Sequence, residues 1–253
     1  MIKAPESILT IWKKFDDFPM ETLTKAWLIH SRRERKQRVV SQMKEHRIQY
    51  GITGNCFDLA LWLLDEFRKA GATAYPIGHN LHTPSAHAAI IVLDELGRRY
   101  LCDLGDQWLQ PILIETTSED FTEESLNGFF PAAKVQVKAD ASHIKIIYHR
   151  PNGRVSKQIY ETRPIEVSEF LTAAQFSHNI LKPRPLLECR TRYKNEVAHW
   201  EFYNWKSFLS TTEGIFHDPK LDTLDHCVNI LHEKTGYDQT FLKEALTIYQ
   251  RIG

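Results

Sequence analysis

A thiol, an imidazole and a carboxylate follow one another in the first half of this chain, at Cys56, His87 and Asp103. Nucleophilic acyl transfer by a cysteine uses this set: the thiolate attacks, the histidine carries the proton, and the carboxylate orients the histidine. Each residue alone has a plain structural interpretation, as a buried helix cysteine, a hydrogen-bonded strand histidine and a turn former. Together, and in this order, they predict a catalytic triad.

Cys56 is expected in the first turn of a buried helix over residues 56–70. Glycines and polar residues over 50–55 predict a turn before it, and Gly71 predicts its end. Apolar residues recur inside the segment at helical spacing: Phe57, Ala60, Leu61, Leu64 and Phe67. At such a helix start the dipole and the free amides favour a thiolate.

His87 and Asp103 are expected on neighbouring strands. Residues 72–78, 86–93 and 99–104 have strand composition, and the turn at 94–97 predicts that the last two pair as a hairpin. The hairpin brings the start of one strand close to the end of its partner. Periodicity alone therefore predicts that the imidazole lies beside the carboxylate.

Three further residues are predicted to bind the substrate or its oxyanion. The backbone N–H of Cys56 or Phe57 is the expected oxyanion donor, and Asn55 stands directly before the cysteine. Trp108, with Phe129 and Phe130, is a candidate lining for an aromatic pocket, although packing in the core is the more common use of such side chains.

The rest of the chain reads as a mixture of helices and strands. Residues 1–20 are expected to form a packed, irregular arm with a short helix. Further helices are expected over 21–30, 165–181, 221–234 and 240–252, and further strands over 134–137, 144–149, 155–160, 187–193 and 197–205. The predicted fold class is α+β, with a helical N-terminal part, a central antiparallel sheet or barrel and a C-terminal helical lid.

Two segments have no assigned role. The basic run Arg32–Arg38 is most simply a solvated helix face, and alternatively a docking surface for the phosphates of an acyl donor. Residues 106–131 form a long loop that is expected to shape a substrate pocket.

Composition places the chain among ordinary globular proteins. Hydrophobic residues make up 42%, and Lys plus Arg equal Asp plus Glu at 32 each, so charge does not favour nucleic acid or a membrane as partner. The scattered cysteines lack disulfide density and zinc-site spacing, and Cys102, Cys189 and Cys227 are expected in the core. His79 and His82 have no further ligand nearby, so no metal site is predicted. No signal peptide or membrane span is apparent, and the cytoplasm is the expected compartment.

The Cys56, His87 and Asp103 motifs resemble those of the arylamine N-acetyltransferases and, more widely, of the transglutaminase-like enzymes of the papain-like superfamily. Pro111, the segment 164–177 and the segment 221–237 are similar to the acetyltransferases as well. The sequence departs from that family in two places. Ile52-Thr53-Gly54 stands where Arg-Gly-Gly is usual, with Asp58 in place of a glutamate, and Gly105-Asp106-Gln107 stands where Gly-Phe-Gly is usual.

The resemblance implies a single catalytic unit over residues 1–253, with a helical part at 1–71, a β-rich part at 72–210 and helices at 211–253. It implies ping-pong transfer of an acyl group from acetyl-CoA or another acyl-CoA, through Cys56, to an amine acceptor. The partners are then small molecules, and no tightly bound cofactor is expected. Two alternatives stay open: a transglutaminase-like thiol hydrolase, amidase or peptidase that works without coenzyme A, and a non-catalytic binding module that keeps the fold.

Overall fold

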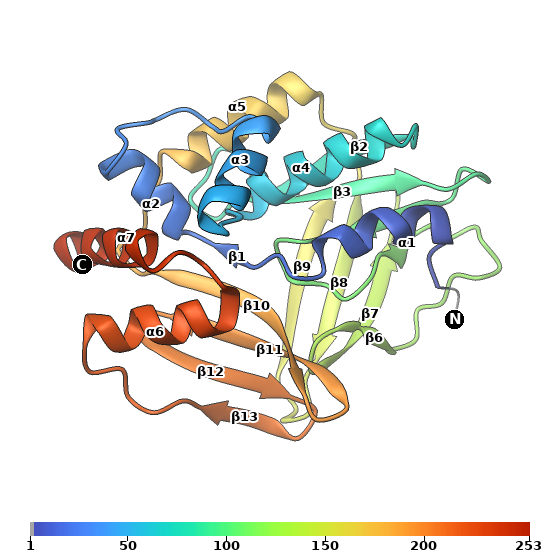
Figure 1. Ribbon diagram of the computed structural model, residues 1–253. Helices are drawn as coiled ribbons and strands as arrows, with labels where there is room; N and C mark the ends of the chain where they lie inside the picture. The colour runs from blue at the N-terminus through green and yellow to red at the C-terminus, as the bar shows by residue number, and fades with distance from the viewer. Residues whose placement is uncertain (1–2) are drawn as a thin grey trace.

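A computed structural model describes residues 3–253, which fold into helices and antiparallel β-sheets (Figure 1). The helices are α1 (Glu6–Trp12), α2 (Leu23–His30), α3 (Val40–Tyr50), α4 (Cys56–Lys69), α5 (Val167–His178), α6 (Leu224–Thr235) and α7 (Gln239–Ile252), with a 3-10 turn at Lys13–Phe15. The strands are β1 (Met20–Glu21), β2 (Ala74–His79), β3 (His87–Leu93), β4 (Arg99–Cys102), β5 (Ile112–Leu113), β6 (Leu126–Phe130), β7 (Ala133–Ala139), β8 (His143–His149), β9 (Val155–Glu161), β10 (Leu186–Tyr193), β11 (Glu196–Tyr203), β12 (Lys206–Thr211) and β13 (Gly214–His217). The α+β class predicted from the sequence is confirmed.

Within the described residues the strands form three open sheets. One sheet has the order β2-β3-β4-β5, a second β6-β7-β8-β9, and the third β1-β10-β11-β12-β13. The third sheet joins β1, from the start of the chain, to strands that follow residue 185. None of the three sheets closes into a barrel, so the central element of the prediction is a set of open sheets.

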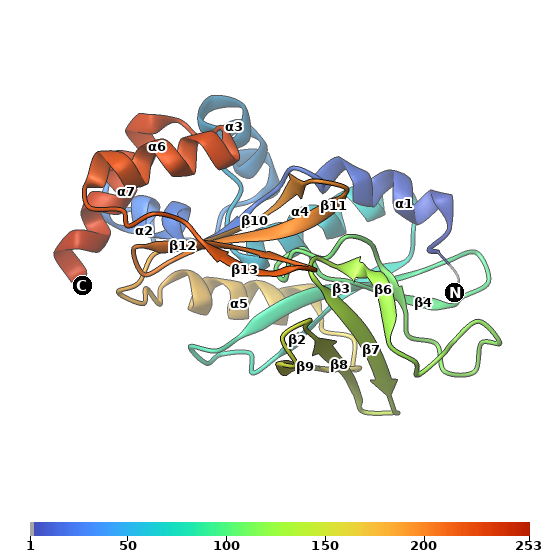
Figure 2. The ribbon, with the colours of Figure 1, turned by 90° about the horizontal axis from the view of Figure 1, so that it is seen from below.

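The helices cover the sheets in two groups. In Figure 1, α2 to α5 gather above the sheets, and α4 packs against β3 and β2. Figure 2 shows α6 and α7 together over one side of the third sheet, where α7 packs against α2. The C-terminal helices therefore form part of the packed body, and of their residues only Tyr249 lines the pocket that contains Cys56.

Helix α4 begins at Cys56 because Asn55 caps it. The Asn55 side chain accepts hydrogen bonds from the backbone N–H groups of Phe57 and Asp58, at 2.9 and 3.2 Å. Asp58 returns a bond by accepting from the Asn55 N–H at 3.1 Å, which completes a capping box. The shortened acid at position 58 thus has a structural use in starting the helix that carries the cysteine.

The buried apolar side chains form two separate clusters. The larger contains α1, α4 and the first two sheets, with Cys56 packed at its edge. The smaller contains α2, α6, α7 and the strands β10 and β11, with Tyr249 among its members. Cys102 lies in the larger cluster and Cys189 and Cys227 in the smaller, as expected.

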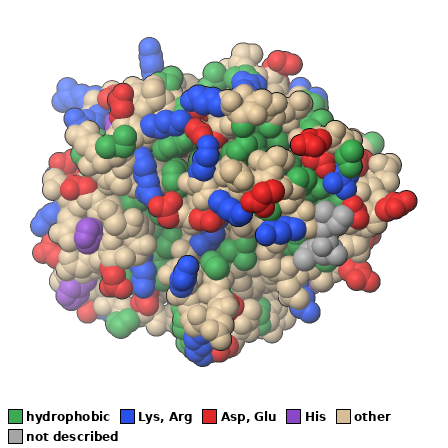
Figure 3. Space-filling model, turned by 45° about the vertical axis from the view of Figure 1, so that its right-hand side comes forward, with side chains coloured by type: hydrophobic (Ala, Val, Ile, Leu, Met, Phe, Trp, Pro, Cys, Tyr) green, Lys and Arg blue, Asp and Glu red, His purple; other side chains and the backbone are tan. Residues whose placement is uncertain are grey.

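Several elements differ from the prediction. The β-rich part continues to His217, because β13 adds an edge strand after β12. Residues 106–131 are not one long loop, since β5 pairs with β4 and β6 pairs with β7 inside that span. No helix over residues 3–253 combines the length and apolarity that a membrane crossing requires. On the face shown in Figure 3, acidic and basic side chains are interspersed.

Candidate active site

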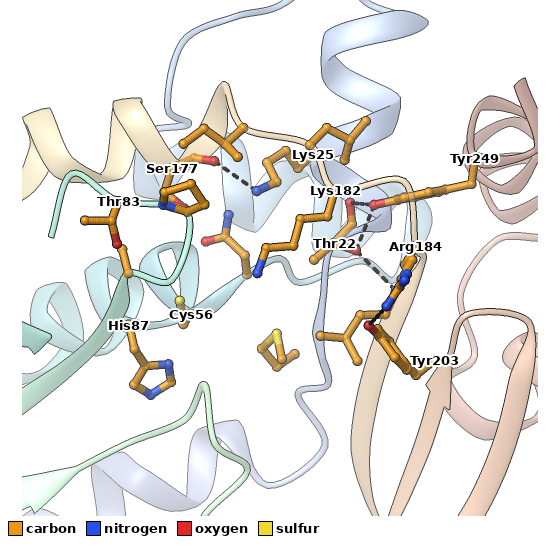
Figure 4. A pocket seen from close by; sticks show the side chains of 17 residues that line it. Thr22, Lys25, Cys56, Thr83, His87, Ser177, Lys182, Arg184, Tyr203 and Tyr249 are labelled. Carbon is orange, nitrogen blue, oxygen red and sulfur yellow. Dashed lines mark hydrogen bonds between the residues drawn. The ribbon is translucent and has the colours of Figure 1, made fainter. Parts of the chain in front are cut away.

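Cys56 and His87 line one pocket of about 250 Å³ (Figure 4). Cys56 is at the first position of α4 and is partly exposed, whereas Cys102, Cys189 and Cys227 are buried. His87 begins β3 and comes to the same pocket from the neighbouring sheet. Among the four cysteines, Cys56 is thus the one that a small molecule reaches together with a histidine.

Asp103 lies behind His87, and its side chain is fully buried. The Nε2 atom of His87 is 2.7 Å from Oδ2 of Asp103. A carboxylate only accepts hydrogen bonds, so Nε2 carries the proton in this contact and Nδ1 is the nitrogen left for the Cys56 thiol. The structure therefore brings the three predicted catalytic residues together in the order thiol, imidazole, carboxylate.

The pKa of His87 is raised well above its ordinary value of 6.5. Burial of the ring lowers the pKa, but the charge and hydrogen bond of Asp103, followed by a hydrogen bond and charge from Cys56, raise it by more. An imidazolium is consequently favoured at neutral pH. This charge state is the one that accompanies a cysteine thiolate.

Two buried tyrosines of the second sheet hold the carboxylates behind the histidine. Tyr160 of β9 donates its hydroxyl hydrogen to Oδ2 of Asp103, and Tyr148 of β8 donates to Oδ2 of Asp106. The backbone N–H of Asp106 in turn donates to Oδ1 of Asp103 at 2.9 Å. Burial and the charge of Asp103 raise the pKa of Asp106 to about 6. The second sheet thus fixes the position of the carboxylate that orients His87.

Gly105 provides the space in which Cys56 and His87 meet. A Cβ atom at this position would lie 2.5 Å from Cβ of Cys56 and 3.2 Å from Cε1 of His87. The first distance is shorter than any contact between carbon atoms that are not bonded. The glycine is therefore required by close approach, and it is the one residue of the expected Gly-Phe-Gly segment that this chain keeps at the site.

Asn55 and Phe57, both predicted to serve the oxyanion, have different positions. The N–H of Phe57 is already bonded to the Asn55 cap, so it is occupied. The Asn55 side chain lines the pocket, and its Nδ2 atom is buried with no hydrogen-bond partner in residues 3–253. Because Oδ1 accepts both cap bonds, the amide orientation is set and Nδ2 is the free end.

Trp108 and the segment 106–131 are not part of this pocket. Trp108 is completely buried and donates its indole N–H to the Tyr148 hydroxyl at 3.1 Å, beside Asp106. Phe129 and Phe130 are core residues as well. None of the residues 106–131 lines the pocket, so the substrate roles predicted for Trp108 and for the loop do not fit their positions. The pocket wall comes instead from residues 83–87 and 177–186.

Arg38 is the exception in the basic run. Arg32, Arg33, Arg35 and Lys36 are exposed, but Arg38 is only 2% exposed and forms an ion pair with Asp58 at 3.1 Å. It also donates to the carbonyl of Thr53, in the turn before the cysteine. Residues 31–39 lie between α2 and α3, so the basic run is not on a helix face. The interpretation as a solvated surface is wrong for Arg38, whose guanidinium lies against the turn before Cys56.

Sequence reasoning missed the cations of the pocket. Lys25 of α2, Lys182 and Arg184 all line it, together with Thr83 of the β2–β3 loop (Figure 4). They come from segments with no motif around them, so no sequence pattern pointed to them. Lys25, Lys182 and Arg184 reach the same pocket because β1 pairs with β10, which brings α2 beside the segment after α5.

The sequence matches no family model and no curated protein. The structure, by contrast, is similar to solved arylamine N-acetyltransferases. A variant of the Mycobacterium smegmatis enzyme shares 10% identity with a TM-score of 0.74, covering 98% of this chain and 91% of that one. The Mycobacterium tuberculosis enzyme shares 14% identity with a TM-score of 0.71, covering 97% of this chain and 91% of that one.

The Mycobacterium marinum enzyme in complex with CoA shares 12% identity with a TM-score of 0.70, covering 93% of this chain and 87% of that one. The similarity thus includes most of both chains while sequence identity is very low. The chain has the fold of the arylamine N-acetyltransferases.

Proposed function

We propose that the protein is a cysteine-dependent acyltransferase that moves an acyl group from an acyl-CoA, through Cys56, to an amine acceptor. The observation that carries the proposal is the shared pocket of Cys56 and His87 with Asp103 bonded behind the histidine. The fold adds support, since one of its solved representatives is a complex with CoA. The cytoplasm is the compartment that belongs to this proposal.

The first half-reaction loads the cysteine. His87 takes the proton of the Cys56 thiol at Nδ1, and the thiolate attacks the thioester carbonyl carbon to form a new C–S bond. The bond between that carbon and the CoA sulfur then breaks. The CoA thiolate leaves and receives the proton held by His87, so atoms and charge balance.

The second half-reaction empties the cysteine. The acceptor amine attacks the acyl carbon of the Cys56 thioester while His87 takes a proton from its nitrogen. The C–S bond to Cys56 breaks, and the amide product is released. The site returns to a thiolate beside an imidazolium, the pair that the raised pKa of His87 favours.

We assign the negative oxygen of both intermediates to two hydrogen-bond donors beside Cys56. The backbone N–H of Cys56 has no acceptor within residues 3–253, and the buried Nδ2 of Asn55 has none either. A buried donor without a partner carries a desolvation cost that a transient oxyanion removes. Asn55 thus has two uses, as the cap of α4 and as an oxyanion donor.

The test is the mass of the intact protein after incubation with acetyl-CoA. We expect an acetyl adduct on Cys56, no adduct in Cys56→Ser, and strongly slowed loading in His87→Gln. Asn55→Ser keeps a good helix cap but removes the amide donor, so it should slow loading by about 10²–10³-fold with little loss of stability. Loading of Cys56 by a glutamine peptide, with no adduct from any acyl-CoA, would favour the coenzyme-free alternative.

A further inference from the structure

The pocket beside Cys56 contains positive charge that no carboxylate balances. Lys25, Lys182 and Arg184 line it, and no Asp or Glu of residues 3–253 does. The hydrogen-bond partners of these cations are neutral: Lys25 donates to the carbonyl of Ser177 at 2.9 Å, and Arg184 donates to the hydroxyl of Tyr203 at 3.2 Å. A concave surface with cations of this kind attracts an anion.

Lys25 is the most deeply placed of the three. Its burial lowers the pKa of its ammonium group, and Cys56 and Asp58 act in the opposite direction. The nearest carboxylates do not pair with it, because Asp58 is paired with Arg38 and Glu21 accepts its hydrogen bonds from Thr24. A half-buried ammonium group without an anionic partner is costly, and a bound anion would remove that cost.

The position of the charge shows which part of a substrate it meets. In Figure 4 the amino group of Lys182 points into the space beside Cys56, and the amino group of Lys25, bonded to the Ser177 carbonyl, lies on the wall of the same pocket. The pantetheine arm of an acyl-CoA keeps the phosphates many bonds away from the thioester. With the arm extended and the thioester carbon at Cys56, the phosphates lie away from the reacting carbon. The anion closest to Lys25 is then one carried by the acyl group or by the acceptor.

We infer that Lys25, together with Lys182, binds a carboxylate of the reacting substrate. The enzyme then prefers an acyl group or an amine acceptor that carries a carboxylate close to the reacting carbon, and Lys25 is a specificity-determining residue. This inference rests on the proposed acyl transfer for its biological meaning. The anion site itself can be measured without any acyl-CoA.

The direct test compares the alkylation of Cys56 by iodoacetate and by iodoacetamide. In both reactions the thiolate forms a C–S bond and displaces iodide, but only iodoacetate carries a carboxylate on the attacked carbon. The ratio of the two rates therefore cancels the reactivity of the thiolate itself. We expect this ratio to exceed that of a small free thiol by about 10-fold or more, as expected for one close charge pair that is partly desolvated.

Matched variants make the test specific. Lys25→Met should lower the ratio by several-fold, although the charges of His87 and Lys182 remain in this variant. Lys25→Arg should keep the ratio high, and Lys220→Met, at an exposed lysine outside the pocket, should leave it unchanged. If Lys25 acts only by increasing the reactivity of the Cys56 thiolate, Lys25→Met slows the reactions with both reagents equally and the ratio of the two rates stays the same. That outcome, or a wild-type ratio equal to that of a free thiol, overturns the inference.

Two further arms identify the source of the carboxylate. Loading of Cys56 from succinyl-CoA is compared with loading from acetyl-CoA, and transfer to 4-aminobenzoate is compared with transfer to aniline. We expect a preference for the carboxylate in one arm, and its loss in Lys25→Met. A preference for the neutral compound in both arms counts against the inference. A Lys25-dependent alkylation ratio without loading from any acyl-CoA supports the anion site and contradicts the proposed transferase.

Discussion

Arg38 and Asp58 form a buried ion pair, 3.1 Å long, at the start of the helix that carries Cys56. Asp58 also accepts from the Asn55 N–H, and Arg38 also donates to the Thr53 carbonyl. The pair thus ties the turn before the cysteine to a segment 15 or more residues earlier in the chain. The position of the nucleophile depends on it.

Arg38→Met should lower the free energy of unfolding by roughly 3–5 kcal/mol, because Asp58 and the Thr53 carbonyl lose their partner while buried. Urea unfolding measures this loss. Arg35→Met, at an exposed position of the same run, is the control and should change stability by less than about 0.5 kcal/mol. Equal effects of the two substitutions would show that the pair does not stabilise the turn.

Asp103→Asn should lower the pKa of His87. Burial lowers the pKa of His87, and the charge and hydrogen bond of Asp103 are the largest causes that raise it. Without the carboxylate the pKa should therefore fall. A proton NMR titration of the ring measures the pKa in both proteins. We also expect acyl transfer to fall by about 10²–10⁴-fold. A ring that titrates at the same pH in both proteins contradicts the pairing of the two side chains.

Gly105→Ala should abolish the reactivity of Cys56, because the new methyl group collides with Cβ of Cys56 and with the His87 ring. The collision involves the start of a helix, so we expect a stability cost of about 1–3 kcal/mol as well. Gly97→Ala is the matched control. Gly97 has a φ of +76° and open space around it, so this substitution tests backbone strain without a collision. Unchanged alkylation of Cys56 in Gly105→Ala would show that the close approach is not maintained in solution.

Asp106→Asn should stabilise the protein at neutral pH but not in acid. The folded-state pKa of Asp106 is raised from 3.8 to about 6, so between these values the folded protein binds more protons than the unfolded chain. Stability due to this group therefore falls as pH rises through that window. At pH values above this window, Asp106→Asn should raise the free energy of unfolding by at most roughly 3 kcal/mol. The gain is smaller than this limit because asparagine keeps only part of the hydrogen bonding of the aspartate.

Unfolding of both proteins at about pH 4 and about pH 7 measures the effect, since the difference between them should appear only at the higher pH. His87 adds to the same trend in the wild-type protein. Its raised pKa gives stability that is complete below 6.5 and is lost as pH rises through the higher folded-state pKa. An equal difference between the two proteins at both pH values would contradict the Asp106 assignment.

The sequence was sufficient to predict the elements around Cys56, His87 and Asp103. The helix from Cys56 to the stop at Gly71 and the β3–β4 hairpin are local features, and local sequence patterns specify them, whereas the cap at Asn55 was not predicted. The predicted contact between the side chains of His87 and Asp103 is present in the structure. These predictions depended on residues that are close together in the chain.

The features that the sequence did not reveal depend on contacts between distant segments. Arg38 looked like one cation in an exposed run, and only the fold shows that it is buried against Asp58. Trp108 was a candidate pocket residue, but it is buried in the core, where its indole N–H donates to the hydroxyl of Tyr148, 40 residues later in the chain. Lys25 and Lys182 have no motif at all. Their shared pocket exists because the first strand pairs with the tenth.

The pocket lies where the two hydrophobic clusters meet. Met20, Cys56 and Ala86 belong to the edge of the larger cluster, whereas Leu181 and Tyr249 belong to the smaller one. A substrate in this position therefore contacts both clusters at once, so its binding should make the two clusters unfold together more cooperatively.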